Sequence, residues 1–434
     1  MRRRGRSWIV TAAALLGTMV PCRAYALQPL ATFVESSKRN NPDNREAQAL
    51  REQRDAQRDV ATAALLPSFT AQGIYTRNQY EAAFSAPNGQ RATLTPLNGL
   101  DANLTVAVPI INVGAWEQRR AATANLAAAE ASRASTEVSV ESSTAQAYYQ
   151  LLGNEAVLSS AKESVRFADG NMKLVQDRRA LGTASELDVQ RAVADLARAQ
   201  RDVAEADQGV VQARRVLESL SRLTPEPATR EDYREDDLHE EPPLSAWLGR
   251  PSDDLVSVRP ATLATEAAER SRSAARAAWL PTLSAQGQEH LTNAGGFTGR
   301  HSIYTVQGVV TWKLDFGLAP NVAAQTAAVG AARAREDKAR RSAEDAIYQS
   351  WQQVRVGIEK ARAARAQVKS ATLAQELARD RYASGVATQI EVVQAQRDFF
   401  SAAVAQAQAD FDLQYARAAL RLSSRRISEE EGSR

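Results

Sequence analysis

Four short segments of the chain alternate hydrophobic and polar residues with a period of two. They are 68–77, 100–109, 282–291 and 303–312. In the last of them, Tyr304 and Val306 point to one side and Thr305 and Gln307 to the other. Each segment has about ten residues, the length that a tilted membrane-spanning strand needs. Two structures fit this pattern: a barrel whose apolar face meets lipid, or a pair of hairpins on a soluble core.

Polar stretches rich in Gly, Asn and Pro separate the members of each pair, at 78–99 and 292–302. We expect both stretches to be exposed loops. Four strands cannot close a barrel, and eight leave an interior that side chains fill. If the strands line an open pore, several chains must contribute. Three chains with four strands each give the smallest number with a clear lumen.

Most of the remaining chain has a helical pattern with a seven-residue repeat. The segment 115–181 contains no proline and carries apolar residues at every seventh position from Leu151 to Met172. The pattern continues from Val189 to Leu217 in 186–222. A sustained heptad predicts coiled-coil packing. A helix of about 65 residues would be roughly 100 Å long.

The chain contains the same succession of segments twice. ALLPSFTAQG at 64–73 returns as AWLPTLSAQG at 278–287, and ALGTASELDVQ at 180–190 returns as ASGVATQIEVV at 383–393. A repeat this long is not a solenoid unit, so it predicts two equivalent halves. Each half has a helix, a strand pair, a long helix and a further helix. The first half is 27–222, with one helix over 31–64, and the second is 259–423, with helices over 259–279, 321–383 and 389–423. This combination favours a channel that is part barrel and part helical tube.

The segment between the halves, 223–258, has a different composition. It contains five prolines and an acidic run from Glu231 to Glu241. It is predicted to be a linker, either a small irregular belt with a short strand or helix, or a disordered segment. The last residues, 424–434, are predicted to be a charged, flexible tail.

Residues 1–26 have the features of a secretory signal peptide: an arginine-rich start, a short apolar core and Ala24-Tyr25-Ala26 as a cleavage site. An uncleaved anchor and lipidation at Cys22, the only cysteine, are the alternatives. Cleavage would remove five arginines and change the formal net charge from +3 to about −2, with 49 basic against 51 acidic residues. This change removes the main support for a nucleic-acid partner.

The residues offer no enzymatic constellation. The three histidines, His239, His290 and His301, fall in the linker, at a strand end and in a loop, and are interpreted as lone surface side chains. No spacing of His, Cys and carboxylates predicts a metal site, and there is no phosphate-binding loop or nucleophile elbow. We therefore expect no cofactor and no catalysis.

The two turns between the long helices hold the candidate functional residues. They are Gly182, Ser185, Glu186, Asp188, Gly385, Thr388 and Glu391. The glycines suit a left-handed C-terminal cap, and Ser/Thr followed three residues later by Asp/Glu is a capping box. Capping alone explains the carboxylates. The alternative is that they form a ring at the mouth of a tunnel that favours cations. The arginine pairs at 178–179 and 340–341 are interpreted as solvated helix faces.

Taken together, these motifs resemble the TolC-type outer-membrane efflux family of Gram-negative bacteria. The residues that carry the resemblance are Leu66-Pro67-Ser68 and Leu280-Pro281-Thr282 before the strands, VPIINVG (108–114) and VTWKLDFG (310–317) after them, and the turns RALGTASELDVQRA and YASGVATQIEVVQAQ. The resemblance covers nearly all of the chain after residue 26. One departure is Ala387, where some relatives carry a basic residue at the tip.

The resemblance implies a mainly α fold with a small transmembrane β part. A homotrimer would share a twelve-stranded barrel in the outer-membrane lipid, continued into the periplasm by a tunnel of long antiparallel coiled-coil helices, an α-barrel. It also implies two partners, a periplasmic adaptor (membrane fusion) protein and an inner-membrane pump of the RND or ABC type.

The expected function is therefore a passive exit duct that carries small molecules such as drugs and toxic compounds from the pump across the outer membrane. Type I protein secretion is an alternative within the same fold. A periplasmic coiled-coil adaptor or scaffold is a rival of another class, but an adaptor would not repeat the strand pair in both halves.

Overall fold

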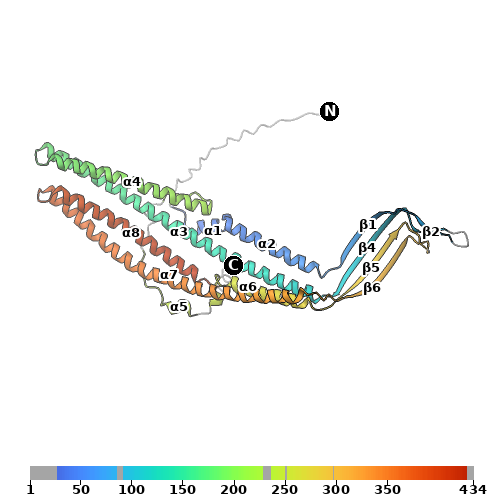
Figure 1. Cartoon of the computed structure of the whole chain (residues 1–434). Coiled ribbons are helices and arrows are strands. Elements are labelled where there is room, and N and C mark those ends of the chain that lie inside the picture. The colour runs from blue at the N-terminus through green and yellow to red at the C-terminus, as the bar shows by residue number, and fades with distance from the viewer. Residues whose placement is uncertain (1–26, 86–90, 228–235, 250–251, 297, 428–434) are drawn as a thin grey trace, which may run out of the picture.

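A computed structural model describes residues 27–85, 91–227, 236–249, 252–296 and 298–427. The molecule is elongated, with a β-sheet at one end and, at the other end, called the tip, the turns that connect the long helices (Figure 1). The expected signal peptide, with Cys22, and most of the expected tail lie outside the described residues.

Long helices form the body of the molecule. They are α1 (Leu30–Asn40), α2 (Pro42–Ala63), α3 (Val113–Ala180), α4 (Glu186–Ser221), α6 (Arg259–Ala277), α7 (Leu318–Ala383) and α8 (Gln389–Ser423). The 68 residues of α3 reach from the sheet to the tip, a distance of about 100 Å at 1.5 Å per residue. It packs against α4 in its tip half and against α1 and α2 nearer the sheet, while α7 packs against α8 and α6 in the same way.

The helix expected over 31–64 is in fact two helices, α1 and α2. The side chain of Asn41 accepts a hydrogen bond from the amide of Asp43 at 2.8 Å, which caps α2. Pro42 is the first residue of α2, where its missing N–H costs nothing, but the proline prevents α1 from continuing. The prediction of a single helix was wrong because this local stop and start signal was overlooked.

Four antiparallel strands form the sheet, in the order β1 (Ser68–Arg77), β4 (Asn98–Ile111), β5 (Thr282–Thr292) and β6 (Ser302–Thr311). The register places Phe69 opposite Val106, Val106 opposite Gly287, and Gly287 opposite Val306, so one face is mainly apolar across all four strands, with Glu289 as a charged exception between Leu104 and Tyr304. The other face carries Thr, Ser, Gln and Asn. Among the described strands, β1 and β6 each have one edge without a partner, so the sheet is open.

The sequence predicted that the stretch 78–99 is an exposed loop, but part of it is folded. It contains a second hairpin, β2 (Ala82–Ser85) paired with β3 (Arg91–Thr95), beyond the end of the main sheet. The side chain of Asn78 donates to the carbonyl of Pro96 at 2.8 Å and so fixes the base of this hairpin. Its strands are short and rich in Ala and Thr, too short for a period to be recognised.

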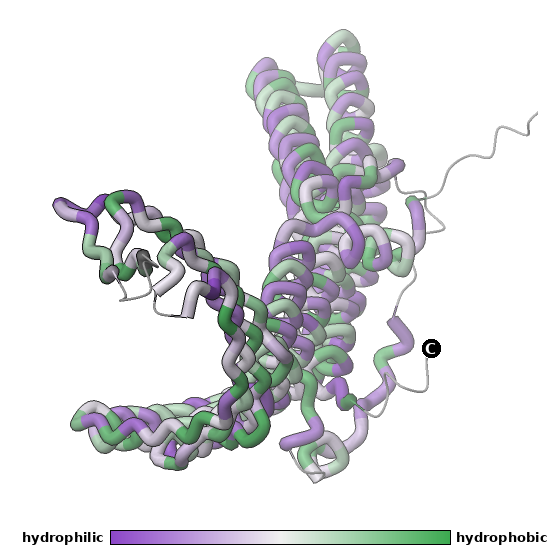
Figure 2. The backbone as a smooth tube through the Cα atoms, turned by 90° about the vertical axis from the view of Figure 1, so that its right-hand side faces the viewer, coloured by the Kyte–Doolittle hydropathy of each residue, from purple (hydrophilic) through white to green (hydrophobic). Residues whose placement is uncertain are grey.

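Narrow seams of small and branched residues hold the helices together, as the heptads indicate. Leu151 and Val175 of α3 and Leu217 of α4 are fully buried, and Val210 of α4 is nearly so. Hydrophobic and hydrophilic residues alternate along the helices and the strands (Figure 2). Within the described ranges, no helix has both the length and the apolar character required to cross a bilayer.

The segment between the halves is partly folded. It contains α5 (Leu244–Leu248) and a 3₁₀ turn (Ser252–Asp254). Its end returns to the C-terminus of α8, where Leu255 and Arg426 form a β-bridge and the amide of Val256 donates to the carbonyl of Arg425 at 3.1 Å. The described part of the linker therefore packs against α7 and α8 of the second half.

A half-buried carboxylate connects three parts of the chain near the middle of the molecule. Glu141 of α3 accepts hydrogen bonds from both terminal nitrogens of Arg425, at 2.8 and 2.9 Å, and lies 3.1 Å from the ammonium of Lys38 on α1. Burial alone would raise the pKa of Glu141, but Arg425 and then Lys38 outweigh it, and the pKa is lowered from its ordinary 4.5. The ionised form is therefore the one that stabilises this junction.

We expect Glu141→Gln to destabilise the fold by about 1–3 kcal/mol at neutral pH, because the charge-assisted bonds are lost in a half-buried site. A lowered folded pKa gives stability that is present above the unfolded pKa and lost as the pH falls through the folded value. The difference between wild type and variant should therefore shrink in acid. Thermal unfolding followed by circular dichroism across pH measures it. Glu130→Gln, which removes an exposed pair with Arg51, is the control and should change stability by less than about 1 kcal/mol.

Candidate functional site

The turn between α3 and α4 is built as the sequence indicates. Gly182 has φ +75°, and the amide of Thr183 donates to the carbonyl of Arg178 at 2.9 Å. The hydroxyl of Ser185 accepts from the amide of Asp188, and the carboxylate of Asp188 accepts from the amide of Ser185, both at 3.2 Å. This reciprocal cap satisfies two amides that would otherwise lack partners.

The turn between α7 and α8 repeats this geometry with a looser cap. Gly385 has φ +82°, and the amide of Val386 donates to the carbonyl of Arg381 at 2.9 Å. The carboxylate of Glu391 accepts from the hydroxyl of Thr388 at 3.1 Å and from its amide at 3.5 Å. Both glycines have positive φ, and neither has a neighbour that a Cβ would touch, so the strained backbone alone explains the choice of residue.

The structure brings the seven candidate residues to the same end of the molecule (Figure 1). Asp188 and Glu391 are occupied as caps. The third carboxylate, Glu186, lies 2.5 Å from a guanidinium nitrogen of Arg179. The negative charge of Glu186 is therefore balanced within its own chain.

Arg178, interpreted above as part of a solvated face, instead joins the two helical hairpins. It donates from Nη2 to the carbonyl oxygen of Ala383 on α7 at 2.6 Å, and its guanidinium lies 4.5 Å from the centre of the Tyr382 ring. Tyr382 is buried in a cluster with Val175, Val189 and other residues from all four long helices of the tip. Burial raises the pKa of the Tyr382 hydroxyl, so the ring remains neutral beneath the cation.

Two further contacts continue this connection away from the tip. The side-chain amide of Gln396 on α8 donates to the carbonyl of Ser164 on α3 at 2.8 Å. Arg397 on α8 lies 3.3 Å from the carboxylate of Asp195 on α4. We call the contacts of Arg178, Gln396 and Arg397 with the opposite hairpin the inter-hairpin seam. Sequence analysis missed it because it pairs residues more than 200 positions apart.

The inter-hairpin seam contains a buried carboxylate, Asp195, whose loss of hydration is unfavourable. The side chain of Asp195 is only 7% exposed, and burial raises its pKa, although Arg397 and then Arg198 act in the opposite direction. A half-exposed partner such as Arg397 does not fully repay the lost hydration. The ionised form of Asp195 therefore opposes closure of the seam.

Asp195→Asn is expected to stabilise the protein at neutral pH by up to about 1 kcal/mol, because Asn keeps a hydrogen-bond acceptor for Arg397 without a buried charge. A folded pKa that is raised gives stability below the unfolded pKa, and this stability is lost as the pH rises through the folded value. The advantage of Asn should thus disappear in acid. Arg397→Ala should have the opposite effect and lower the free energy of unfolding by about 1–3 kcal/mol, since it removes the arginine that pairs with the carboxylate. Thermal unfolding of both variants at neutral and acid pH checks the sign.

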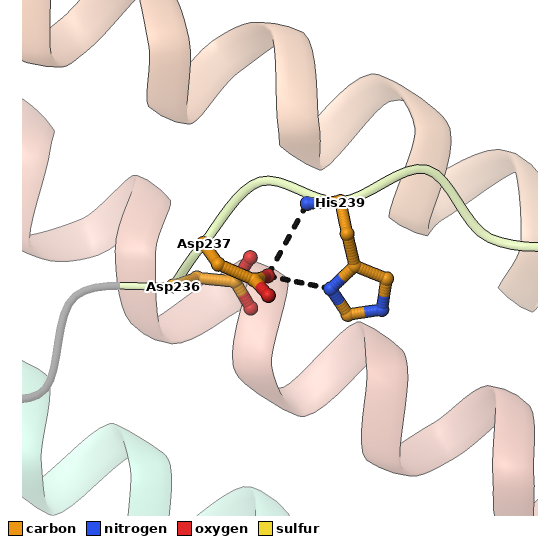
Figure 3. A group of neighbouring side chains, drawn as sticks. All are labelled: Asp236, Asp237 and His239. Carbon is orange, nitrogen blue, oxygen red and sulfur yellow. Dashed lines mark hydrogen bonds and ion pairs between the residues drawn. The ribbon is translucent and has the colours of Figure 1, made fainter.

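The described linker is fixed to α8 by a buried arginine, Arg417. Arg417 donates to both carboxylate oxygens of Asp236 at 2.9 Å, to Glu241 at 2.6 Å and to the carbonyl of His239 at 2.8 Å. Asp236, Asp237 and His239 lie close enough to suggest a metal site (Figure 3). However, Asp236 is held by Arg417, and the ring of His239 lies between Asp237 and the Arg417 guanidinium. A cation would have to compete with this arginine, so the cluster is better explained as an anchor.

The other two histidines lie near the outer end of the sheet. His290 is on the polar face of β5, with its ring against Asn103 and Asp101. His301 lies in the β5–β6 loop, and its Nδ1 atom is 3.0 Å from the carbonyl oxygen of Thr292. Neither is close to the tip.

Comparisons with known proteins agree with this architecture. A family model described as outer membrane efflux protein matches residues 33–221 and 256–424. A comparison with curated protein sequences finds no match.

Solved structures of outer-membrane proteins are similar over nearly the whole chain. The Campylobacter jejuni CmeC channel has a TM-score of 0.78 at 18% identity, covering 94% of this chain and 89% of that one. The open state of the Neisseria gonorrhoeae MtrE channel has 0.76 at 20%, covering 92% and 89%. Vibrio cholerae VceC has 0.74 at 17%, covering 91% and 95%. At these identities the likeness shows a shared fold.

Proposed function

The chain belongs to the outer membrane efflux protein family, and we propose that three copies form a passive exit duct in the outer membrane. In this proposal β1 of one copy pairs with β6 of the next, which closes a barrel of twelve strands. The single observation that carries the proposal is the open four-stranded sheet with one mainly apolar face that extends over all four strands. A sheet edge left unpaired in lipid would be very costly, so three copies that share their edges solve the problem that each has alone.

The helices would continue the duct into the periplasm. Channels of this family act as trimers with an adaptor protein and an inner-membrane pump. The pump would supply the energy that drives transport, because the family and the structural neighbours are channels and not enzymes. The cargo is proposed to be small molecules such as drugs and toxic compounds. If a type I secretion system supplies the partners instead, the duct itself is unchanged.

The two turns at the tip are the proposed site of gating and of contact with the adaptor. Exposed apolar side chains, among them Leu187 and Ile390, lie next to the caps at Ser185 and Thr388. The inter-hairpin seam keeps the hairpins together there. Opening would separate the hairpins and break the contacts of Arg178, a change between two packings of the kind that interfaces permit.

A photo-crosslinking amino acid at Leu187 or Ile390, introduced in living cells, tests the proposal. Both positions are exposed and neither caps a helix, so the turns stay intact. We expect a covalent adduct with a periplasmic adaptor from both tip positions and none from Val60, an exposed residue on α2 near the sheet. Identification of the adaptor by mass spectrometry would distinguish drug efflux from protein secretion. Recovery of the chain as a soluble periplasmic protein without tip adducts would contradict the proposal and favour the scaffold alternative.

A further inference from the structure

A row of polar side chains on β4 and β5 lies at the outer end of the polar face of the sheet. Asn103 and His290 are direct cross-strand partners. The Nδ1 atom of His290 lies 2.8 Å from Oδ1 of Asn103, and Nε2 lies 3.3 Å from Oδ1 of Asp101. The side-chain amide of Gln288 donates to the same Asn103 oxygen at 3.2 Å. One histidine is thus placed between an amide oxygen and a carboxylate.

The neighbours of the ring determine where its proton lies. Because Asn103 accepts from Gln288, it presents an oxygen to His290, and Nδ1 must carry a hydrogen to complete a hydrogen bond. In the neutral ring, Nε2 then has a lone pair, and this lone pair faces a carboxylate oxygen. Two acceptors at this distance repel unless a positive charge lies between them. His239 is different, because its Nε2 faces the guanidinium of Arg417 at 2.9 Å.

The geometry of this pair suits a transition-metal ion. Zinc binds imidazole nitrogen at about 2.0–2.1 Å and carboxylate oxygen at about 2.0–2.2 Å, so two ligands of a tetrahedral ion lie about 3.3–3.5 Å apart. Histidines that bind metal commonly donate their other N–H to a fixed acceptor, as His290 does to Asn103. The two side chains also line a cavity of about 390 Å³, which gives water room to complete the coordination. An imidazole ligand favours zinc or nickel over calcium or magnesium.

We infer that Asp101 and His290 form a binding site for a divalent transition-metal ion, with Zn²⁺ as the reference ion. Asn103 and Gln288 orient the ring and are not ligands. The site itself needs only one chain. Its consequence rests on the proposed function: in a trimer, three such sites would line the lumen near its outer mouth. Three bound Zn²⁺ ions would replace a ring of carboxylate charge by positive charge and reduce the passage of cations.

Zinc affinity of the full-length mature protein, purified in detergent, tests the site by competition with a chromophoric chelator at neutral pH. We expect one Zn²⁺ per chain in the wild type. His290→Gln removes the nitrogen ligand but keeps a polar side chain, and should weaken binding by more than about tenfold, while Asp101→Asn should weaken it by about tenfold. His301→Gln is the matched control at the same end of the sheet and should bind as the wild type does. Circular dichroism and heat-modifiable migration verify that each variant is folded.

Two results would overturn the inference. If the wild type binds no zinc at millimolar concentration, a proton bridges the pair and there is no metal site. If His290→Gln binds zinc as tightly as the wild type, the ion is bound elsewhere. Planar-bilayer recordings separate this question from the proposed function. If the protein binds zinc through His290 but conducts no ions, the metal site is supported and the duct is refuted. If it conducts ions but has no zinc affinity, the duct is supported and the metal site is refuted.

Discussion

Replacing Arg178 with alanine should raise the open fraction of the channel in planar bilayers by roughly ten- to a hundredfold. The variant loses a charge-assisted hydrogen bond to the carbonyl of Ala383 and a cation–π contact with Tyr382. For a half-buried arginine these contacts together contribute about 1–3 kcal/mol in each chain. A difference of about 1.4 kcal/mol changes a two-state equilibrium tenfold. In the proposed gating, only the closed packing of the tip makes these contacts.

The neighbouring arginine provides the control for this experiment. Arg179 lies in the same turn of the same helix, but it pairs with Glu186 within its own hairpin, and both side chains are about half exposed. Such a surface pair contributes less than about 1 kcal/mol, so Arg179→Ala should leave the conductance nearly unchanged. If both alanine variants open the channel equally, the loss of positive charge and not the bond between hairpins is responsible. If neither does, the inter-hairpin seam does not control the gate.

Val306→Arg is expected to abolish assembly of the protein in the outer membrane. Val306 lies in the middle of β6 on the apolar face of the sheet and is 79% exposed in the single chain. An arginine on the lipid face of a barrel costs about 2–4 kcal/mol near the middle of the bilayer, and a trimer would carry three. Fractionation of outer membranes and migration of unheated samples in gels measure the loss.

Gln307 is the matched control because it is the next residue of the same strand and faces the other way. On the polar face, the arginine of Gln307→Arg would be in contact with water in the proposed lumen. We therefore expect normal assembly with reduced cation passage. Equal behaviour of the two variants would mean that neither face meets lipid, which is the result expected for a sheet on a soluble core.

The sequence was most informative where a pattern is local and repeated. Period-two alternation identified the four strands of the main sheet, since each alternates over about ten residues. The heptads identified the long helices in the same way, and Gly182 and Gly385 identified the turns, because a positive φ strongly favours glycine. The hairpin β2–β3 was missed because its strands of four and five residues are too short to show a period.

Contacts between distant parts of the chain could not be derived from such patterns. Arg178 belongs to an arginine pair that looks solvated, and only the fold brings it to Tyr382 on α7. Arg417 is similar, because its carboxylate partners lie in a linker without a periodic pattern. His290 was interpreted as a lone surface residue because its neighbour Asp101 is on another strand, and the register that pairs β4 with β5 is a property of the folded sheet.

The number of chains in the particle is the most direct test of the whole account. Native mass spectrometry of the mature protein, extracted from outer membranes in a mild detergent, measures it in a single experiment. We expect a mass of three chains, since three open sheets close one barrel. A monomer that remains folded and soluble after the detergent is removed would contradict the account, because the apolar face of its sheet would then have no lipid to meet and its edges no partner.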